Sequence, residues 1–237
     1  MTLNLTPEVI VDFIVAISGF VLTIITYIKP KTKKISSLNY IRLAIFSFSI
    51  FIFVDGLSIL YVSKLLSIIS GLILIPLTLS LVIGITYITK ESYYSLGFVT
   101  VVGLSVLFIY LSFQPNAVDI QIQGGYIRPP WMGLFSDIGM ILTAICEIYI
   151  LYWGIKTFMN APFLIKKEAY LFFLGIFSAS VVAMVFYVLY LIDPFYILLS
   201  NIALLIGLLI ITLSALIEPK LLYILPFTVY RLSLIHI

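Results

Sequence analysis

The sequence predicts an all-α membrane protein, a polytopic bundle of seven transmembrane helices with its N-terminus outside the cell and its C-terminus in the cytoplasm. Hydrophobic residues make up 63% of the chain and charged residues only 10%. A soluble domain carries roughly 25% charged residues, so this chain could not cover a water-facing surface with them. We therefore expect a multi-pass protein of the cell membrane, with most of its surface in contact with lipid.

The segment from Trp131 to Trp153, WMGLFSDIGMILTAICEIYILYW, forms the clearest of the predicted helices. At a helical rise of about 1.5 Å per residue its two indole rings would stand ~33 Å apart, close to the ~30 Å thickness of the hydrocarbon core. Tryptophan favours the boundary between lipid and water. We therefore predict that Trp131 and Trp153 are membrane-border anchors at the two ends of this helix.

Apolar runs near the ~20 residues needed to cross a bilayer recur along the whole chain. Short polar connections separate them, and proline or glycine interrupts the pattern at most boundaries. The longest connection, residues 114–130, contains Pro115, Gly124-Gly125 and Pro129-Pro130. The predicted helices span residues 8–28, 39–63, 65–88, 93–113, 131–155, 168–192 and 195–217.

Lysine and arginine are distributed unevenly between the two sides of this predicted bundle. Eleven of the 13 basic residues fall on the side of the C-terminus, and only Lys64 and Arg128 fall on the other side. Cytoplasmic loops carry such an excess, so the basic side is predicted to be inside, in agreement with an odd number of spans. The inside set is Lys29, Lys31, Lys33, Lys34, Arg42, Lys90, Lys156, Lys166, Lys167, Lys220 and Arg231.

Three polar residues within predicted helices lie at similar depth below the outer boundary. Asp55, Asp137 and Asn201 are each about six to eight residues, roughly 9–12 Å, from the outer end of their helix. Ionisable groups inside a bilayer are costly, so they are candidates for function. The three could line a polar cavity open to the outside and bind a ligand or ion. Alternatively, each makes a local hydrogen bond between helices.

Glu147 lies deeper, in the cytoplasmic half of the Trp131–Trp153 helix. A stripe at helical spacing, formed by Gly133, Ser136, Met140, Thr143, Glu147, Ile150 and Gly154, is predicted to face the bundle interior. Burial disfavours the charged carboxylate, and no basic residue lies in the centre of any predicted span. Glu147 is therefore expected to be protonated or to hold a cation, as part of a proton-linked switch or of a structural hydrogen bond.

Several classes of function lack the residues that they need. The last predicted helix has no lysine for a retinal Schiff base, the only histidine is His236, and Cys146 is the only cysteine. No metal-ligand spacing, phosphate-binding loop or signal peptide is recognisable. We expect no catalytic residue, no metal, no cofactor and no nucleic-acid partner.

Three regions are expected along the chain. Residues 1–218 form the seven-helix transmembrane domain, and residues 219–231 form a juxtamembrane exit into the cytoplasm. Residues 232–237, LSLIHI, resemble the in-frame translation of a transposase mosaic-end adapter used in sequencing libraries. We therefore expect the natural sequence to stop near Arg231 in this record and its C-terminal part to be missing, unless these residues form a genuine short β-like tail.

The seven-span layout with an external N-terminus and the exit EPKLLYILPFTVYR resemble the N-terminal seven-helix region of sensor histidine kinases and related uncharacterised archaeal membrane proteins. The resemblance implies a sensor or receptor input module that binds an unknown small ligand outside and signals to a cytoplasmic domain or protein. One alternative is a small transporter for a solute or cation, with two three-helix repeats joined by a linking helix. Another is a structural membrane subunit.

Overall fold

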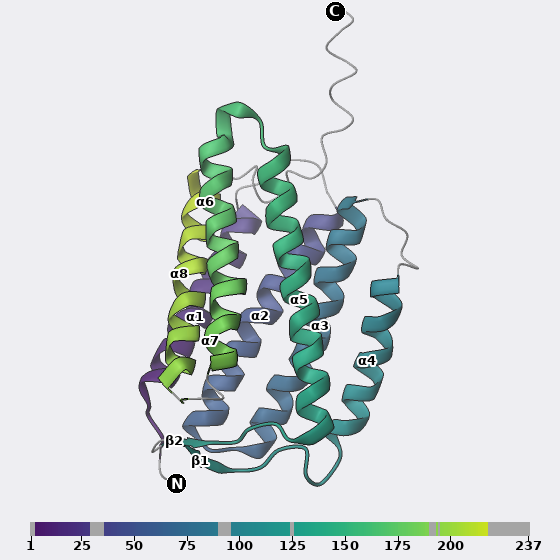
Figure 1. The fold of residues 1–237 in the computed structure, drawn as a ribbon, viewed down its shortest axis with the longest axis vertical. Helices are drawn as coiled ribbons and strands as arrows, with labels where there is room; N and C mark the ends of the chain where they lie inside the picture. The colour runs from purple at the N-terminus through teal and green to yellow at the C-terminus, as the bar shows by residue number, and fades with distance from the viewer. Residues whose placement is uncertain are drawn as a thin grey trace, which may run out of the picture.

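A computed structural model describes residues 3–28, 36–89, 96–123, 126–189, 193 and 195–217. The predicted juxtamembrane exit, the adapter-like tail with His236, and Lys29, Lys31, Lys33, Lys34, Lys90 and Lys220 lie outside these residues. Apart from one two-stranded sheet, the regular elements of the described residues are helical (Figure 1). The prediction of an all-α polytopic protein is confirmed.

The elements follow the predicted order with shifted boundaries. The helices are α1 (Pro7–Ile28), α2 (Ser36–Leu60), α3 (Lys64–Thr89), α4 (Leu96–Ser112), α5 (Gly133–Asn160), α6 (Lys166–Phe177), α7 (Ala183–Leu189) and α8 (Phe195–Ile217). The strands β1 (Gln121–Gln123) and β2 (Tyr126–Arg128) lie between α4 and α5, and a 3-10 turn, Phe163–Ile165, precedes α6. A π-helical turn, Ser178–Val182, joins α6 to α7, so Lys166–Leu189 is one continuous rod.

Six helical segments of the described residues are long and apolar enough to cross a membrane. They are α1, α2, α3, α5, the rod from α6 to α7, and α8. The fourth predicted span corresponds to α4, which has 17 residues and is shorter than the other six. It falls at the lower limit of the roughly 17–25 residues used by transmembrane helices. The number seven therefore stays a prediction.

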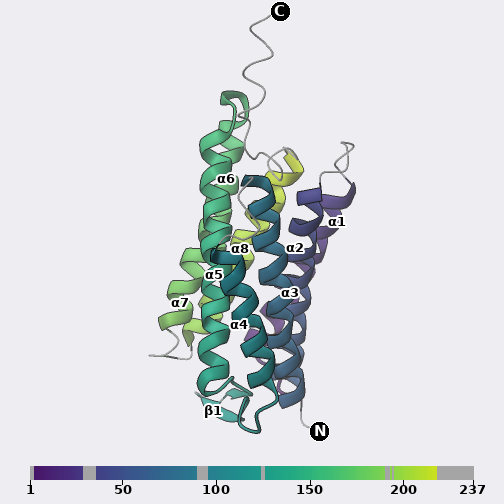
Figure 2. The ribbon, with the colours of Figure 1, turned by 90° about the vertical axis from the view of Figure 1, so that its right-hand side faces the viewer.

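The six long segments form a ring in chain order (Figures 1 and 2). Each packs against the next, α3 packs against α5, and α8 closes the ring on α1. The short helix α4 is outside the ring and packs against α3 and α5. Apolar residues from α1, α3 and α6 belong to one core cluster, which includes Leu22, Leu74 and Phe172.

One end of the bundle, called here the hairpin end, is covered by the connection between α4 and α5. Strands β1 and β2 pair antiparallel, with Ile122 opposite Ile127. The Asn4 side chain donates to the carbonyl oxygen of Ile127 at 2.7 Å, and the Ser67 hydroxyl donates to that of Pro129 at 2.9 Å. The connection is thereby fastened to the chain before α1 and to α3.

Candidate functional site

Two acidic residues of α1 are buried in the hairpin half of the bundle. Glu8 and Asp12, one helical turn apart, are 5% and 4% exposed. A buried carboxylate needs hydrogen-bond or charge partners to offset its desolvation. The Asn201 amide of α8 donates to Asp12 Oδ1 at 2.7 Å, which joins the first and last helices of the ring.

A further acidic residue of the hairpin half, Asp55, lies on α2, five residues before the end of that helix at Leu60. The Ser70 hydroxyl of α3 donates to Asp55 Oδ1 at 3.2 Å. The neighbouring residue, Gly56, is in close contact with α1, because a Cβ placed there would be 3.3 Å from the Asp12 Cβ. We call Glu8, Asp12, Asp55, Ser70 and Asn201 the hairpin-side cluster. It connects α1, α2, α3 and α8.

The expectation of one cavity lined by Asp55, Asp137 and Asn201 is only partly met. Asn201 and Asp55 belong to the hairpin-side cluster, but the Asp137 side chain is exposed and does not join them. Equal depth does not determine the direction in which a residue points around its helix. The buried face of α5 includes Phe135, Ile138 and Leu142, and Asp137 lies off that face. The acidic partner of Asn201 is Asp12 of α1, whereas the sequence pattern had grouped Asn201 with Asp137.

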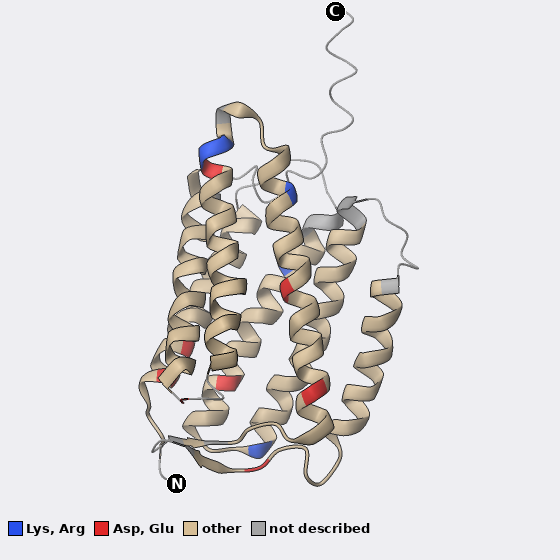
Figure 3. Cartoon of the chain, viewed as in Figure 1, with Lys and Arg blue, Asp and Glu red and all other residues tan. Residues whose placement is uncertain are grey.

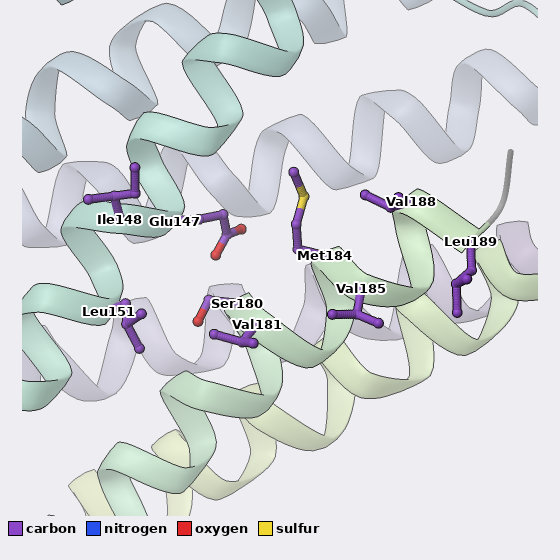
Figure 4. Close-up of a pocket in the computed structure, with 9 residues that line it drawn as sticks. All are labelled: Glu147, Ile148, Leu151, Ser180, Val181, Met184, Val185, Val188 and Leu189. Atoms are coloured by element: carbon purple, nitrogen blue, oxygen red, sulfur yellow. The ribbon is translucent and has the colours of Figure 1, made fainter.

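Glu147 lies near the middle of α5, roughly 20 Å from either end of the helix. Its Oε2 atom is buried and receives no hydrogen bond from the described residues. Glu147 is one of the residues that line an open, apolar-surfaced crevice of about 430 Å³ between α5 and α7 (Figure 4). The other lining residues are Ile148, Leu151, Ser180, Val181, Met184, Val185, Val188 and Leu189.

The predicted interior stripe on α5 is only partly inside the bundle: Gly154 is buried, and Ser136, Thr143, Glu147 and Ile150 are half-buried. Gly133 is exposed and Met140 is 44% exposed, whereas Leu142 and Cys146 are buried. The interior face is mostly apolar and is rotated from the predicted stripe. Glu147 therefore lies at the edge of that face, next to the π-helical turn, and not at the centre of the bundle.

Close packing of α6 on α8 accompanies the π-helical turn. A Cβ placed on Gly207 would lie 2.6 Å from the backbone nitrogen of Ala179 and from the carbonyl oxygen of Gly175. Within the turn, the Ser178 hydroxyl donates to the Ala203 carbonyl of α8 at 2.9 Å, and the Ser180 hydroxyl donates to that of Ile176 at 2.8 Å. Single π turns occur frequently at functional sites.

The interface of α5 with α6 contains further buried polar atoms without a hydrogen bond from the described residues. They are Trp153 Nε1, Thr157 Oγ1 and Glu168 Oε2. The Trp153 ring is 6% exposed and packs edge-on against Phe172, at 5.3 Å between centroids. The other predicted anchor, Trp131, donates its indole N–H to the Ser67 carbonyl at 3.1 Å. Both tryptophans thus contact other helices, and Trp153 is buried within the bundle.

Charges divide between the two ends of the bundle (Figure 3). Acidic residues lie mainly in the hairpin half, where Lys64 forms an exposed ion pair with Asp119 at 3.4 Å. Toward the opposite end, Arg42 donates to the Thr26 carbonyl, and Lys166 donates to the Phe158 carbonyl at 2.6 Å. Cations at carbonyl ends of helices are favoured by the helix dipole. Of the eleven basic residues predicted to lie inside, Arg42, Lys156, Lys166 and Lys167 belong to the described part of the chain.

The geometry defines the class of the protein as a polytopic helical membrane protein with buried polar groups at two levels. Within the described residues no group of three or more histidine, cysteine, aspartate or glutamate residues could hold a metal ion. The thiol of Cys146 contacts the Thr78 hydroxyl at 3.1 Å, an interaction between α5 and α3. Comparison with protein-family models, curated proteins and solved structures finds no match to this chain.

Proposed function

We propose that this protein is the membrane input module of a sensor or receptor, with seven spans and the hairpin end outside the cell. The strong excess of basic residues on the opposite side supports this orientation. The Lys64–Asp119 pair supports the seventh span, because it holds the start of α3 and the end of the α4 passage at the same end of the bundle. If α3 crosses the membrane, the chain must cross back through α4.

The observation that carries the proposal is the hydrogen bond from Asn201 to Asp12. It attaches α8 to a cluster that also holds α1, α2 and α3. A small cation or cationic ligand that reaches these carboxylates from outside would compete for Asp12 and change the position of α8. From Asn201 to Ile217, α8 extends roughly 24 Å toward the cytoplasmic side, where a signalling domain or protein would receive the change.

A spin label on α8 tests this proposal. The label replaces Leu213, whose side chain is 58% exposed, in protein reconstituted into lipid vesicles. Na⁺, K⁺, Ca²⁺ and tetramethylammonium are then added one at a time to the hairpin side. We expect at least one of them to change the label's mobility, and expect Asp12→Asn or Asn201→Ala to abolish the change. The matched control Asp137→Asn should retain it. A response that survives Asp12→Asn, or no response to any cation, contradicts the proposal.

A transporter is the second candidate, and the arrangement of the helices favours it over a structural subunit. The ring contains two consecutive units of three long segments. The first is α1, α2 and α3, and the second is α5, the rod from α6 to α7, and α8, while α4 lies outside. Transporters with parallel repeats joined by a linking helix share this layout. For a transporter, uptake of a cation into proteoliposomes should fall in Glu147→Gln or Asp55→Asn, whereas a sensor shows no uptake in the unmodified protein.

A further inference from the structure

Two serine hydroxyls join the rod from α6 to α7 to the last helix, α8. The Ser178 hydroxyl, at the first residue of the π-helical turn, donates to the Ala203 carbonyl of α8 at 2.9 Å. In the opposite direction, the Ser200 hydroxyl of α8 donates to the carbonyl of Ala183, the first residue of α7, at 2.8 Å. These two hydrogen bonds, called here the serine clamps, fasten both ends of the π-helical turn to α8.

The π-helical turn interrupts the regular ladder of helical hydrogen bonds. The Ala183 N–H bonds to the carbonyl oxygens of Ser178 and Ser180, five and three residues earlier. In a regular α-helix it would bond to the single carbonyl four residues earlier. Helices bend preferentially at π turns, because the ladder is broken there. We therefore expect the rod to bend more easily at this turn than within α6 or α7.

Helix α7 has room to move on the side that faces α5. Within the described residues it packs against α8 and not closely against α5. Figure 4 shows the apolar crevice between them, with Ile148 and Leu151 of α5 on one side and Val185 and Val188 of α7 on the other. The width of this gap therefore depends on how α7 is attached to α8.

The hairpin-side cluster is attached to the same turn of α8. Asn201 follows Ser200 directly and precedes Ala203 by two residues, and its amide donates to Asp12 of α1 at 2.7 Å. Successive residues of a helix are rotated by about 100°, so one turn can contact α1 through Asn201 and the rod through the other two. Helix α8 is continuous through this turn. A displacement of α8 at Asn201 therefore displaces both serine clamps.

We propose that residues 200–203 of α8 couple the hairpin-side cluster to α7. When the contact between Asp12 and Asn201 changes, α8 moves the serine clamps, the rod bends at its π-helical turn, and the gap between α5 and α7 changes in width. Ser178 and Ser200 are positioning residues that act on α7 through α8. Control of this coupling by a cation rests on the proposed sensor function, but the coupling itself needs no bound cation.

Two spin labels measure the gap. They replace Ile148 of α5 and Val188 of α7, which are 65% and 52% exposed, in protein held in phosphatidylcholine nanodiscs. The dipolar coupling between the labels reports their separation. We expect Asn201→Ala to change the mean separation by about 1–2 Å, the scale of helix shifts at interfaces, or to widen its distribution. Asp12→Asn weakens the same contact at constant side-chain size, and it covers the case in which Asn201→Ala does not fold.

Variants of the serine clamps show whether α8 carries the effect. In protein that contains Ser178→Ala and Ser200→Ala, Asn201→Ala should no longer change the separation. Ser214→Ala is the matched control, because it removes a buried hydroxyl of α8 that donates within its own helix. It should leave the response intact. An unchanged separation in both Asn201→Ala and Asp12→Asn, an equal response with and without the clamps, or a response lost in Ser214→Ala each overturns the proposal.

The same labels distinguish this proposal from the proposed sensor function. If Asn201→Ala changes the gap but no added cation changes it or the mobility of the label at Leu213, the coupling stands and the sensor proposal fails. If a cation changes the mobility of the Leu213 label and the gap between α5 and α7 stays the same, the sensor proposal stands and the coupling is overturned.

Discussion

Asp12 and Asn201 are separated by 189 positions in the chain, yet their side chains are 2.7 Å apart. Sequence patterns identified Asn201 as a candidate because a polar residue stood in an apolar span. Asp12 was not identified as a candidate, because it lies in the second turn of the first helix, where a carboxylate can face water. Its burial follows from the closing of the ring by α8 on α1. That tertiary contact has no signal in the local sequence.

Asn201→Ala should destabilise the protein by about 1–2 kcal/mol, because it leaves the buried Asp12 carboxyl group without one of its donors. Asp137→Asn should change stability by less than about 0.5 kcal/mol, since that side chain is exposed. Reversible unfolding in mixed micelles measures both. A double-mutant cycle that combines Asn201→Ala with Asp12→Ala isolates the interaction energy between these two side chains. Additive effects of the two substitutions would show that the hydrogen bond contributes nothing.

At the scale of elements, the length of the apolar runs located the long helices well. It did not distinguish the faces of α5, since nearly every position of a helix in lipid can be apolar. The π-helical turn was also missed; in the structure it accompanies a close approach of α6 to α8. A Cβ on Gly207 would come within 2.6 Å of Ala179 and of the Gly175 backbone. Two glycines and an alanine on facing helices allow this contact.

Gly207→Ala should therefore destabilise the protein by about 1–3 kcal/mol, as overpacking at a tight contact usually does. Gly103→Ala in α4 is the matched control. A Cβ there meets nothing within 4 Å, and alanine is the better helix former, so stability should rise by up to about 1 kcal/mol. Thermal unfolding of the two variants provides the comparison. Equal or greater stability of Gly207→Ala would contradict the packing described for α6 and α8.

Ser67 fastens the α4–α5 connection to α3 by donating to the Pro129 carbonyl and by accepting from the Trp131 indole N–H at 3.1 Å. Ser67→Ala should therefore loosen the connection without unfolding the helices. Amide hydrogen exchange of residues 117–132 should become at least several-fold faster, while that of α5 stays the same. Exchange unchanged in the connection would show that the other contacts of β1 and β2 are sufficient to hold it.

For the whole molecule, composition and the length of apolar runs predicted a polytopic helical protein, because lipid demands apolar surfaces and internally bonded backbones. The same reasoning could not predict how the ring closes, where α4 lies, or which carboxylates meet. Those features depend on contacts between helices distant in sequence. Depth along a helix can be estimated by counting residues, which placed Asp55, Asp137 and Asn201 at one level. Rotation about the helix cannot be estimated in this way, so the exposure of Asp137 was not predicted.

The central claim is that the hairpin end lies outside the cell and the α5–α6 connection lies inside. Cysteines introduced at Ile122 in β1 and at Phe163 after α5, which are 75% and 93% exposed, test it directly. The native Cys146 is buried and should remain unreactive. With a membrane-impermeant maleimide on intact cells, we expect Ile122→Cys to be labelled at once and Phe163→Cys only after permeabilisation. Labelling of both positions in intact cells, or of Phe163→Cys alone, would contradict the account.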